Sequence, residues 1–402
     1  MEKKHSIQVP EIVRRFTKIY QIVGLWKNGG ENVSLQQKFY FTFFNVFNST
    51  SFIGMWTIDD IDNTVFLAVL FLILAIQTYR LYFVMWKQNP ILDFLHKISV
   101  NSTDNYQAFS NANYKIKYLF TLAILVLILS YTLCVGVVCL PLIKMQLLFD
   151  IAFPWDYKTN IVAFWMAYAT VAGGYILSIT LVMFTTTVWY MMLIFVIKYD
   201  WLANDFRSLG VARVARQEKS VKNVTDDRAK KNSLTKDLTR FEGEESSYVK
   251  NLVEAIKRLE TINEQLEEFE STFSTLFLLQ IVTSSICICG TTFVLAFMSH
   301  DNVFQYVFYT IEIIYCFADI FAVLYLANEI MLSSDRLSYS LFESNWITQT
   351  QYCKKYIIIV VEYLKKPKQF IVGKLFALNL ETFTLIVKRS FSMFNILRNF
   401  KQ

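Results

Sequence analysis

The residue types that most often carry catalytic or metal chemistry are few in this sequence and lie far apart. The three histidines, His5, His96 and His300, have no spacing that would bring two imidazoles to one metal ion. Cys287 and Cys289 are two residues apart, so a helix points them to different faces and they cannot form a CxxC-type zinc pair. The sequence also contains no nucleophile elbow, phosphate-binding loop or dinucleotide fingerprint. We therefore expect no catalytic residue, no metal site and no cofactor, and an enzyme has little support.

Two carboxylates within an apolar stretch are more informative. Glu312 and Asp319 lie seven residues apart in the apolar block 303–332, so a helix can turn both to one side. Charged side chains are costly inside a membrane and usually face other protein or water. We expect both residues to make interior polar contacts. A transporter that moves protons or cations on them is the alternative, but it would predict repeated or broken helices, and the sequence shows no internal repeat.

Long apolar blocks must position these residues. Hydrophobic residues make up 54% of the 402 residues and charged residues only 18%, whereas a soluble domain has about 45–50% and about 25%. A membrane span needs about 20 apolar residues, and six blocks meet this requirement: 39–56, 64–86, 118–142, 161–197, 272–298 and 303–332. A seventh block, 370–397, is weaker because it contains four charged residues, so we expect it to face protein or water. The blocks predict an all-α membrane protein of seven helical spans.

Positive charge is distributed unevenly between the connections of these spans. Alternate connections carry thirty-one Lys and Arg residues on one side and four on the other. Short loops rich in Lys and Arg stay in the cytoplasm, so we expect the N-terminus inside and, after seven spans, the C-terminus outside. G-protein-coupled receptors have the opposite orientation, which argues against that class.

Beyond the membrane, the segment before the fifth span has a pattern of its own. The stretch 210–245 is polar and is typical of a flexible loop. Apolar residues then recur every three or four positions over 249–269, and no breaker separates them from the span at 272. We therefore expect one continuous helix over 246–298, of which a large part projects into the cytoplasm.

Two further segments extend on the same side. Leu202, Phe206 and Leu209 continue the fourth span as an apolar stripe, and the segment 337–364 contains the apolar run 357–361. With the extension of the fifth span, they predict a cytosolic helical bundle that also serves as an oligomer interface. Amphipathic helices lying on the membrane surface are the alternative.

Short motifs at four places resemble the insect odorant receptors. One precedes the fourth predicted span, one belongs to the cytoplasmic segment, and two lie in the last span: Phe153-Pro154-Trp155-Asp156, Tyr339 and Trp346 with Lys365-Lys366-Pro367, Glu381-Thr382-Phe383, and Ser390-Phe391-Ser392. Length, topology and order of elements extend the resemblance over nearly the whole chain. Insect gustatory receptors share the fold and are the alternative, but their last helix has a Thr-Tyr pair and a terminal Gln-Phe, which are absent here. The modest loop before the fifth span resembles a ligand-tuning subunit more than the longer co-receptor.

The resemblance implies a ligand-gated, non-selective cation channel in the plasma membrane of olfactory sensory neurons. Four subunits would surround one pore lined by the last helix, with co-receptor subunits completing the heterotetramer. Its other partners would be a small volatile odorant, permeant cations and membrane lipids, with no nucleic acid. Ile396 and Phe400 align with the family's hydrophobic gate, which can close by dewetting, and Asn399 aligns with the polar position beside it.

The family's ligand pocket lies in the outer half of the second, third, fourth and sixth spans. Residues at these positions suit a small, weakly polar volatile, because they offer an apolar, aromatic cavity with few hydroxyls: Phe66, Leu70, Tyr131, Cys134, Val138, Trp165, Tyr168, Tyr306, Tyr309 and Ile313. The last three share one helix face by their spacing. For each residue singly, ordinary helix packing is the alternative.

The predicted segments follow one another in a simple order. They are a cytoplasmic N-terminus (1–38), the first four spans with the ligand-binding region (39–200), a cytoplasmic extension, loop and helix (201–271), the fifth and sixth spans (272–332), a cytoplasmic anchor helix (333–369), and the pore-lining seventh helix with an extracellular C-terminus (370–402).

Overall fold

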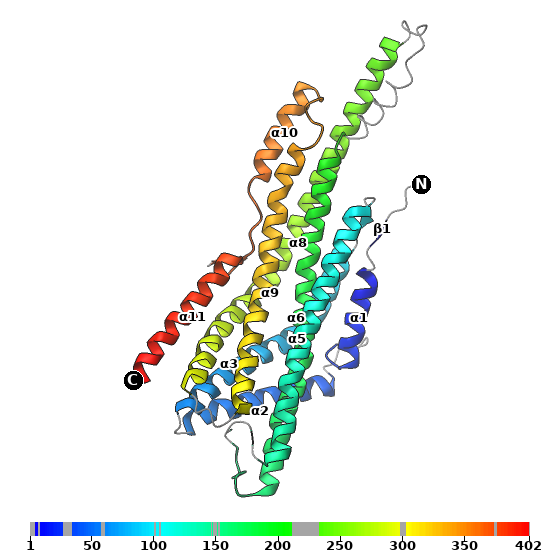
Figure 1. Cartoon of the computed structure of the whole chain (residues 1–402). Helices are drawn as coiled ribbons and strands as arrows, with labels where there is room; N and C mark the ends of the chain where they lie inside the picture. The colour runs from blue at the N-terminus through cyan, green and yellow to red at the C-terminus, as the bar shows by residue number, and fades with distance from the viewer. Residues whose placement is uncertain are drawn as a thin grey trace.

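The computed structural model describes residues 5–6, 9–26, 34–57, 61–99, 102–103, 106–145, 147, 151, 153–210, 233–297, 303–373 and 376–401. Nearly all of this part is helical (Figure 1). The helices are α1 (Val9–Ile22), α2 (Leu35–Thr57), α3 (Ile61–Trp86), α4 (Gln88–Ser99), α5 (Tyr106–Lys144), α6 (Ile161–Ser208), α8 (Ser233–Phe297), α9 (Val303–Phe342), α10 (Gln351–Leu364) and α11 (Leu380–Lys401). Two short antiparallel strand pairs join β1 (His5–Ser6) to β2 (Ser102–Thr103) and β3 (Ile371–Val372) to β4 (Phe376–Ala377).

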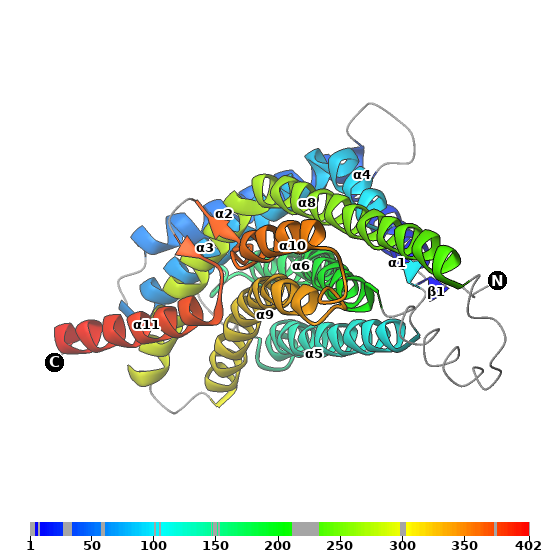
Figure 2. The same cartoon turned by 90° about the horizontal axis from the view of Figure 1, so that it is seen from above.

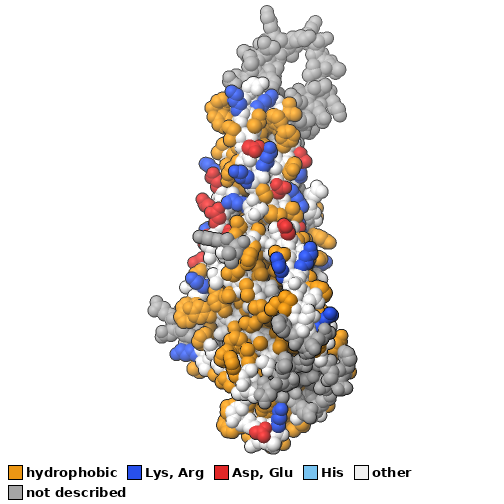
Figure 3. Space-filling view, turned by 90° about the vertical axis from the view of Figure 1, so that its left-hand side faces the viewer, with side chains coloured by type: hydrophobic (Ala, Val, Ile, Leu, Met, Phe, Trp, Pro, Cys, Tyr) orange, Lys and Arg blue, Asp and Glu red, His pale blue; other side chains and the backbone are white. Residues whose placement is uncertain are grey.

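Four helices are much longer than a membrane span. Helices α5, α6, α8 and α9 have 39, 48, 65 and 40 residues, whereas a bilayer needs about 20. They run side by side (Figure 1). At the end of the molecule opposite to α10, the end of α5 lies near the start of α6, and the end of α8 lies near the start of α9. On the face drawn in Figure 3, hydrophobic side chains gather over the lower part and charged ones over the upper part. The lower part therefore has the surface of a membrane domain, and the long helices carry a polar stalk beyond it.

Helix α8 confirms the predicted continuity between the amphipathic segment and the fifth span. It runs unbroken from Ser233 to Phe297, so the expected flexible loop over 210–245 is wrong from residue 233 onward. The sequence contains no proline in 233–245, and Leu234, Leu238 and Phe241 recur at helical spacing. Polar composition alone therefore underestimated the length of this helix.

Helix α6 is the central helix of the bundle. Its residues 184–199 are all buried, and Figure 2 shows α5, α9 and α8 arranged around it. A helix that is apolar on every side requires such an enclosed position. Its first turn is capped by Asn160, whose side chain accepts a hydrogen bond from the Val162 backbone N–H at 2.9 Å. The prediction that no turn divides the block 161–197 is confirmed.

The stalk is a packed helical bundle. Leu202, Phe206 and Leu209 are buried, the Lys198 ammonium donates to Gln265 Oε1 at 2.6 Å, and α10 packs against α9. The predicted packing of the three extensions is therefore confirmed, and helices lying flat on a membrane are wrong for this part of the chain. The apolar run of α10 is only half covered, because Ile357 is buried whereas its two neighbours Ile358 and Ile359 are exposed.

Composition identifies fewer spans than the seven expected. Within the described residues, five helices contain a stretch long and apolar enough to cross a membrane: Leu67–Trp86, Tyr106–Ile143, Val182–Ser208, Tyr248–Phe297 and Tyr306–Phe342. Helices α2 and α11 are not among them. Helix α2 is less apolar because it contains Asn45, Asn48 and several hydroxyl residues. Helix α11 is less apolar because it contains Lys388 and Arg389. These two helices need protein neighbours, or water in the case of α11, to lie in a membrane.

The block 370–397 is not a single helix, contrary to expectation. Its first part forms the hairpin of β3 and β4, with Gly373 at φ 59° in the left-handed region that favours glycine. Helix α11 begins only at Leu380, after Asn379 accepts a hydrogen bond from the Thr382 backbone N–H at 2.8 Å. The seventh helix is therefore Leu380–Lys401, displaced toward the C-terminus by about ten residues at its start.

Candidate functional site

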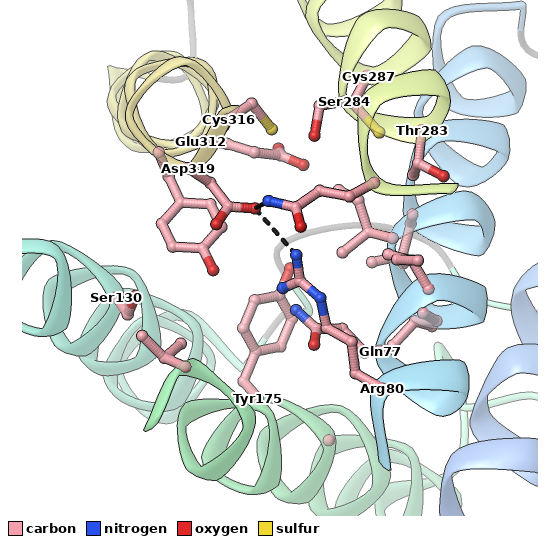
Figure 4. A pocket seen from close by; sticks show the side chains of 18 of the residues that line it. Gln77, Arg80, Ser130, Tyr175, Thr283, Ser284, Cys287, Glu312, Cys316 and Asp319 are labelled. Carbon is pink, nitrogen blue, oxygen red and sulfur yellow. Dashed lines mark hydrogen bonds and ion pairs between the residues drawn. The ribbon is translucent and has the colours of Figure 1, made fainter. Parts of the chain in front are cut away.

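A cavity of about 120 Å³ lies between helices of the membrane part. Figure 4 shows its lining side chains, which come mainly from α3, α6, α8 and α9. Leu70, Ile73, Leu74, Val182 and Phe308 make much of its wall apolar. Concave, mostly apolar cavities with a few polar groups are typical of small-molecule binding sites.

A buried ion pair closes one side of this cavity. Arg80 on α3 lies 3.1 Å from the Asp319 carboxylate on α9, and the two side chains are only 4% and 7% exposed. The side-chain amide of Gln280 on α8 donates to the same Asp319 oxygen at 2.9 Å (Figure 4). Three helices are thus joined by one carboxylate. Removing one side chain of such a buried pair leaves the charge of the other side chain unpaired in a dry environment.

The expected interior contacts of the two carboxylates are confirmed for Asp319, and Glu312 is also buried. In Figure 4 the Glu312 side chain extends from α9 towards Ser284 of α8. Among the described residues, neither its Oε2 atom nor Oε1 of Gln77 on α3 has a hydrogen-bond partner. Both side chains line the cavity, but these two oxygens are themselves buried.

Arg80, Gln77 and Gln280 were not predicted as site residues. The sequence does mark Arg80, because it is an Arg within an otherwise apolar span, and such residues usually indicate a functional or interior contact. Its partner is 239 positions away in the chain, so the pair itself has no local sequence pattern.

A few of the predicted ligand-binding residues lie at the cavity or close to one of its lining residues. Leu70 lines it. Cys134 and Tyr309 are buried close by Tyr175, a further lining residue. The Tyr168 hydroxyl donates to the Val138 carbonyl at 3.0 Å and so joins α6 to α5.

The remaining predicted residues do not meet at the cavity in the single chain. Tyr131, Trp165 and Tyr306 are exposed, and Ile313 is half-buried. Phe66 lies on α3, but its side chain falls outside the described residues. Contact of these side chains with a ligand stays a prediction.

The face of α9 that lines the cavity differs from the predicted one. Phe308, Glu312, Tyr315 and Asp319 line it at spacings of three and four residues, whereas the predicted set was Tyr306, Tyr309 and Ile313. Successive residues are about 100° apart on a helix. An error of one position in choosing the inward face of α9 is therefore enough to leave Glu312 out of the predicted ligand-binding residues.

The predicted gate residues lie near the end of α11. Ile386 and Ser390 are buried and face the rest of the chain, whereas Leu385, Phe391 and Ile396 are exposed. Asn399 is also exposed, and the side chain of Phe400 falls outside the described residues. Helix α11 thus packs one face on α8 and α9, and its exposed face mixes apolar residues such as Phe391 and Ile396 with charged residues such as Lys388 and Arg389.

Long apolar helices, a mostly apolar cavity between them and a helical stalk define a multi-pass helical membrane protein with a candidate small-molecule site. The model of the 7tm Odorant receptor family matches residues 62–391. The chain belongs to this family. Membership confirms the resemblance found in the motifs, it favours the odorant over the gustatory branch, and it makes the protein a receptor and not an enzyme.

Individual relatives agree with this assignment. The chain is 23% identical to putative odorant receptor 92a of Drosophila melanogaster over 62% of this chain and 54% of the relative. It is 22% identical to odorant receptor 2a of the same species over 39% and 40% of the two chains. The matched region thus spans about half the length of the curated relatives or less.

Solved structures show the same fold over the whole chain. The insect olfactory receptor OR5 from Machilis hrabei matches with a TM-score of 0.77 at 14% identity, covering 97% of this chain and 98% of that one. The same receptor in complex with eugenol matches with a TM-score of 0.74. The seven-transmembrane helical fold is therefore confirmed, including α2 and α11, which composition alone does not identify as spans.

Proposed function

We propose that this odorant receptor is the ligand-tuning subunit of a ligand-gated, non-selective cation channel that is completed by co-receptor subunits. The observation that carries the proposal is the set of apolar side chains that α10 and α11 leave exposed, among them Ile358 and Ile359 of α10 and Phe391 and Ile396 of α11. Exposed apolar patches of this kind usually mark a surface that another protein or a membrane covers. The channel would lie in the plasma membrane of olfactory sensory neurons.

Helix α10 supports the assembly. Ile358 and Ile359 are 61% and 64% exposed, and the helix lies at the end of the charged stalk, away from the apolar part of the molecule (Figure 1). The charged surface of the stalk separates this face from the apolar part that lipid would cover. Neighbouring subunits would bury this face in a tetramer.

Helix α11 supports the pore. Among the predicted spans it has the most charged residues, and Lys388 and Arg389 are exposed. A helix of this composition suits a position between protein on one side and water on the other. In the proposed channel, Ile396 and Phe400 form the hydrophobic gate beside Asn399.

The ligand would enter the cavity between α3, α6, α8 and α9. Leu70 lines it, and Cys134 and Tyr309 lie near its lining residue Tyr175. Val138 and Tyr168, which join α5 to α6, would also contribute. Phe66, Tyr131, Trp165, Tyr306 and Ile313 would form its approach from the outer side. Residues 39–200 and 272–332 then form the ligand-binding membrane part, residues 201–271 and 333–369 the cytoplasmic anchor, and residues 370–402 the pore helix and its outer end.

Electrophysiology tests the channel. The full-length chain is expressed with and without a co-receptor subunit in cells that contain neither, and currents are recorded during application of a panel of volatiles. We expect currents only from the pair, with a reversal potential that stays unchanged when Na⁺ replaces K⁺. A response that requires G-protein activity, or that is equally large without the co-receptor, would contradict the proposal.

The orientation has an independent test. The positive connections predict that an epitope added before Met1 is labelled only after cells are permeabilised, whereas one added after Gln402 is labelled on intact cells. Labelling of the Met1 epitope on intact cells would overturn the assigned topology.

A further inference from the structure

A further cavity, larger than the one next to Arg80, lies where the apolar part of the molecule meets the stalk. It has a volume of about 940 Å³ and is lined by α5, α6 and α9, three helices that pack against one another (Figure 2). Two of its lining residues on α5, Tyr114 and Tyr118, are exposed. The cavity is therefore a groove that reaches the surface of the single chain.

The lining of this groove changes in character along the three helices. Within the predicted third, fourth and sixth spans it is mostly apolar and includes Leu119, Leu122, Leu193, Val196, Phe321 and Leu326. Just beyond the ends of these spans, at residues 118, 197 and 332, the lining contains Lys115, Asp200 and Arg336. All three helices thus change from apolar to charged at one level, as expected where the hydrocarbon of a bilayer meets its headgroups.

The apolar part of the groove has the depth of one leaflet. Phe321 lies eleven residues before Leu332, the predicted end of the sixth span, and eleven residues of helix are about 16 Å long. The hydrocarbon core of a bilayer is about 30 Å thick, so one leaflet has about 15 Å. An acyl chain can therefore lie along Leu122 and Phe321 while its headgroup stays at the level of Lys115.

Three charged side chains meet at the headgroup level. The Lys115 ammonium lies 2.6 Å from one oxygen of the Asp200 carboxylate, and the Arg336 guanidinium lies 3.8 Å from the other oxygen. The longer distance is not a hydrogen bond, and the Arg336 side chain is 58% exposed. Two cations thus share one carboxylate, and the local excess of one positive charge favours a phosphate group.

The other charged side chains of the groove limit the headgroup. Among the described residues they are Arg207, Glu329 and Glu343, and Arg207 is paired with Glu343 at 2.6 Å. The lining of the described groove therefore has as many carboxylates as cations. A headgroup with several negative charges would be repelled by the carboxylates, whereas a zwitterionic headgroup brings a single phosphate to Lys115 and Arg336.

We propose that this groove binds a zwitterionic glycerophospholipid from the leaflet next to the stalk. Its phosphate accepts hydrogen bonds from Arg336 and Lys115, and one of its acyl chains lies between α5 and α9 against Leu122 and Phe321. The site is separate from the cavity next to Arg80, and it does not depend on the proposed channel activity.

Matched lipids test the proposal. The full-length receptor is purified in detergent and freed of lipid, and its melting temperature is measured with phosphatidylcholine, with the diacylglycerol and the phosphatidylinositol bisphosphate of the same acyl chains, and with inorganic phosphate. A ligand that binds only the folded state raises the melting temperature. We expect phosphatidylcholine to act at the lowest concentration, because diacylglycerol lacks the phosphate and inorganic phosphate lacks the acyl chain.

The variant Arg336→Gln tests the phosphate contact and leaves the pair of Lys115 and Asp200 in place. It should raise the phosphatidylcholine concentration for half-maximal stabilisation by about tenfold, as expected for a lost hydrogen bond to a charged group. Its response to diacylglycerol should stay unchanged. Lys117→Gln is the matched control, because Lys117 is exposed at the same level of α5 but does not line the groove.

A second variant tests the acyl chain without changing a charge. Leu122 is half-buried in the lining, so the larger ring of Leu122→Trp should fill the groove and abolish stabilisation by phosphatidylcholine. Ile124→Trp is its control. Ile124 is 55% exposed and lies two residues further along α5, about 200° around the helix, so this variant should respond like the wild type.

Several results would overturn the proposal. Equal stabilisation by phosphatidylcholine and diacylglycerol, with no effect of Arg336→Gln, would mean that only general membrane lipid covers this surface. Equal stabilisation by inorganic phosphate would indicate a simple anion site. Stronger binding of the phosphatidylinositol bisphosphate would contradict the zwitterionic headgroup. Absent stabilisation by phosphatidylcholine, or full stabilisation of Leu122→Trp, would exclude a lipid in the groove.

Discussion

At the scale of single residues, the buried pair of Arg80 and Asp319 has the largest energetic consequences. The pair is enclosed, and Gln280 completes the coordination of the Asp319 oxygen. Replacing both charges of a buried pair by apolar residues is often nearly neutral, whereas removing one leaves a buried, unpaired charge. Each of the two charged side chains is therefore tolerated in the interior only while the other is present.

We predict that Arg80→Met alone costs about 3–5 kcal/mol of stability, seen as a lower melting temperature of the purified complex. The double variant Arg80→Met with Asp319→Leu should recover much of this loss, because no charge is left unpaired. Arg15→Met is the control. Arg15 and Glu11 form an exposed pair on one helix, and such pairs contribute about 0.3–0.5 kcal/mol. A double variant less stable than the single one would argue against charge pairing as the role of Arg80.

At the scale of helices, close approach depends on small residues. A Cβ atom at Gly174 of α6 would overlap the ring of Phe47 on α2, whereas a Cβ atom at Gly136 of α5 would meet nothing within 4 Å. Alanine is favoured over glycine in a helix by about 0.5–1 kcal/mol when space permits. The two glycines thus have opposite consequences for the same substitution.

We predict that Gly174→Ala lowers the melting temperature and that Gly136→Ala leaves it unchanged or raises it slightly. Gly174 also lines the cavity, so Gly174→Ala should alter ligand responses as well. Thermal unfolding of the two variants side by side measures the difference. Equal changes in melting temperature for the two variants would mean that α2 can move away from α6 without a loss of stability.

The membrane helices can largely be predicted from the sequence, whereas the cavity between them cannot. The apolar blocks predict the membrane parts of α3, α5, α6, α8 and α9, because helical spans depend on local composition, but the helices themselves extend beyond the blocks. The hairpin before α11 was missed, although Gly373 and the cap residue Asn379 are local signs of it. The cavity was largely missed, because the face that a helix turns inward depends on neighbours far away in the chain, as with Arg80 and Asp319 or the one-residue shift at Glu312.

At the scale of the whole molecule, the exposed face of α10 determines how chains associate. We predict that Ile358→Asp with Ile359→Asp prevents assembly with the co-receptor while the chain itself remains folded, because a charge buried in an apolar interface without a partner is costly. Native gel electrophoresis of the solubilised complex measures the assembly. Ile22→Asp introduces the same chemistry at an exposed isoleucine of α1 and should leave the tetramer intact. A normal tetramer in the Ile358 and Ile359 variant would exclude α10 as the subunit interface.

The position of α6 also has a consequence for how the protein is made. Trp189, Tyr190 and Phe195 are completely enclosed in the finished molecule, and α8 and α9, which complete the enclosure, follow later in the chain. Synthesis proceeds from the N-terminus, so the ribosome releases α6 well before its covering helices exist. Until then, lipid or a chaperone must shield these aromatic rings. A nascent chain halted before Val303 would leave them uncovered, and quality control can recognise this unfinished state by its bare aromatic surface.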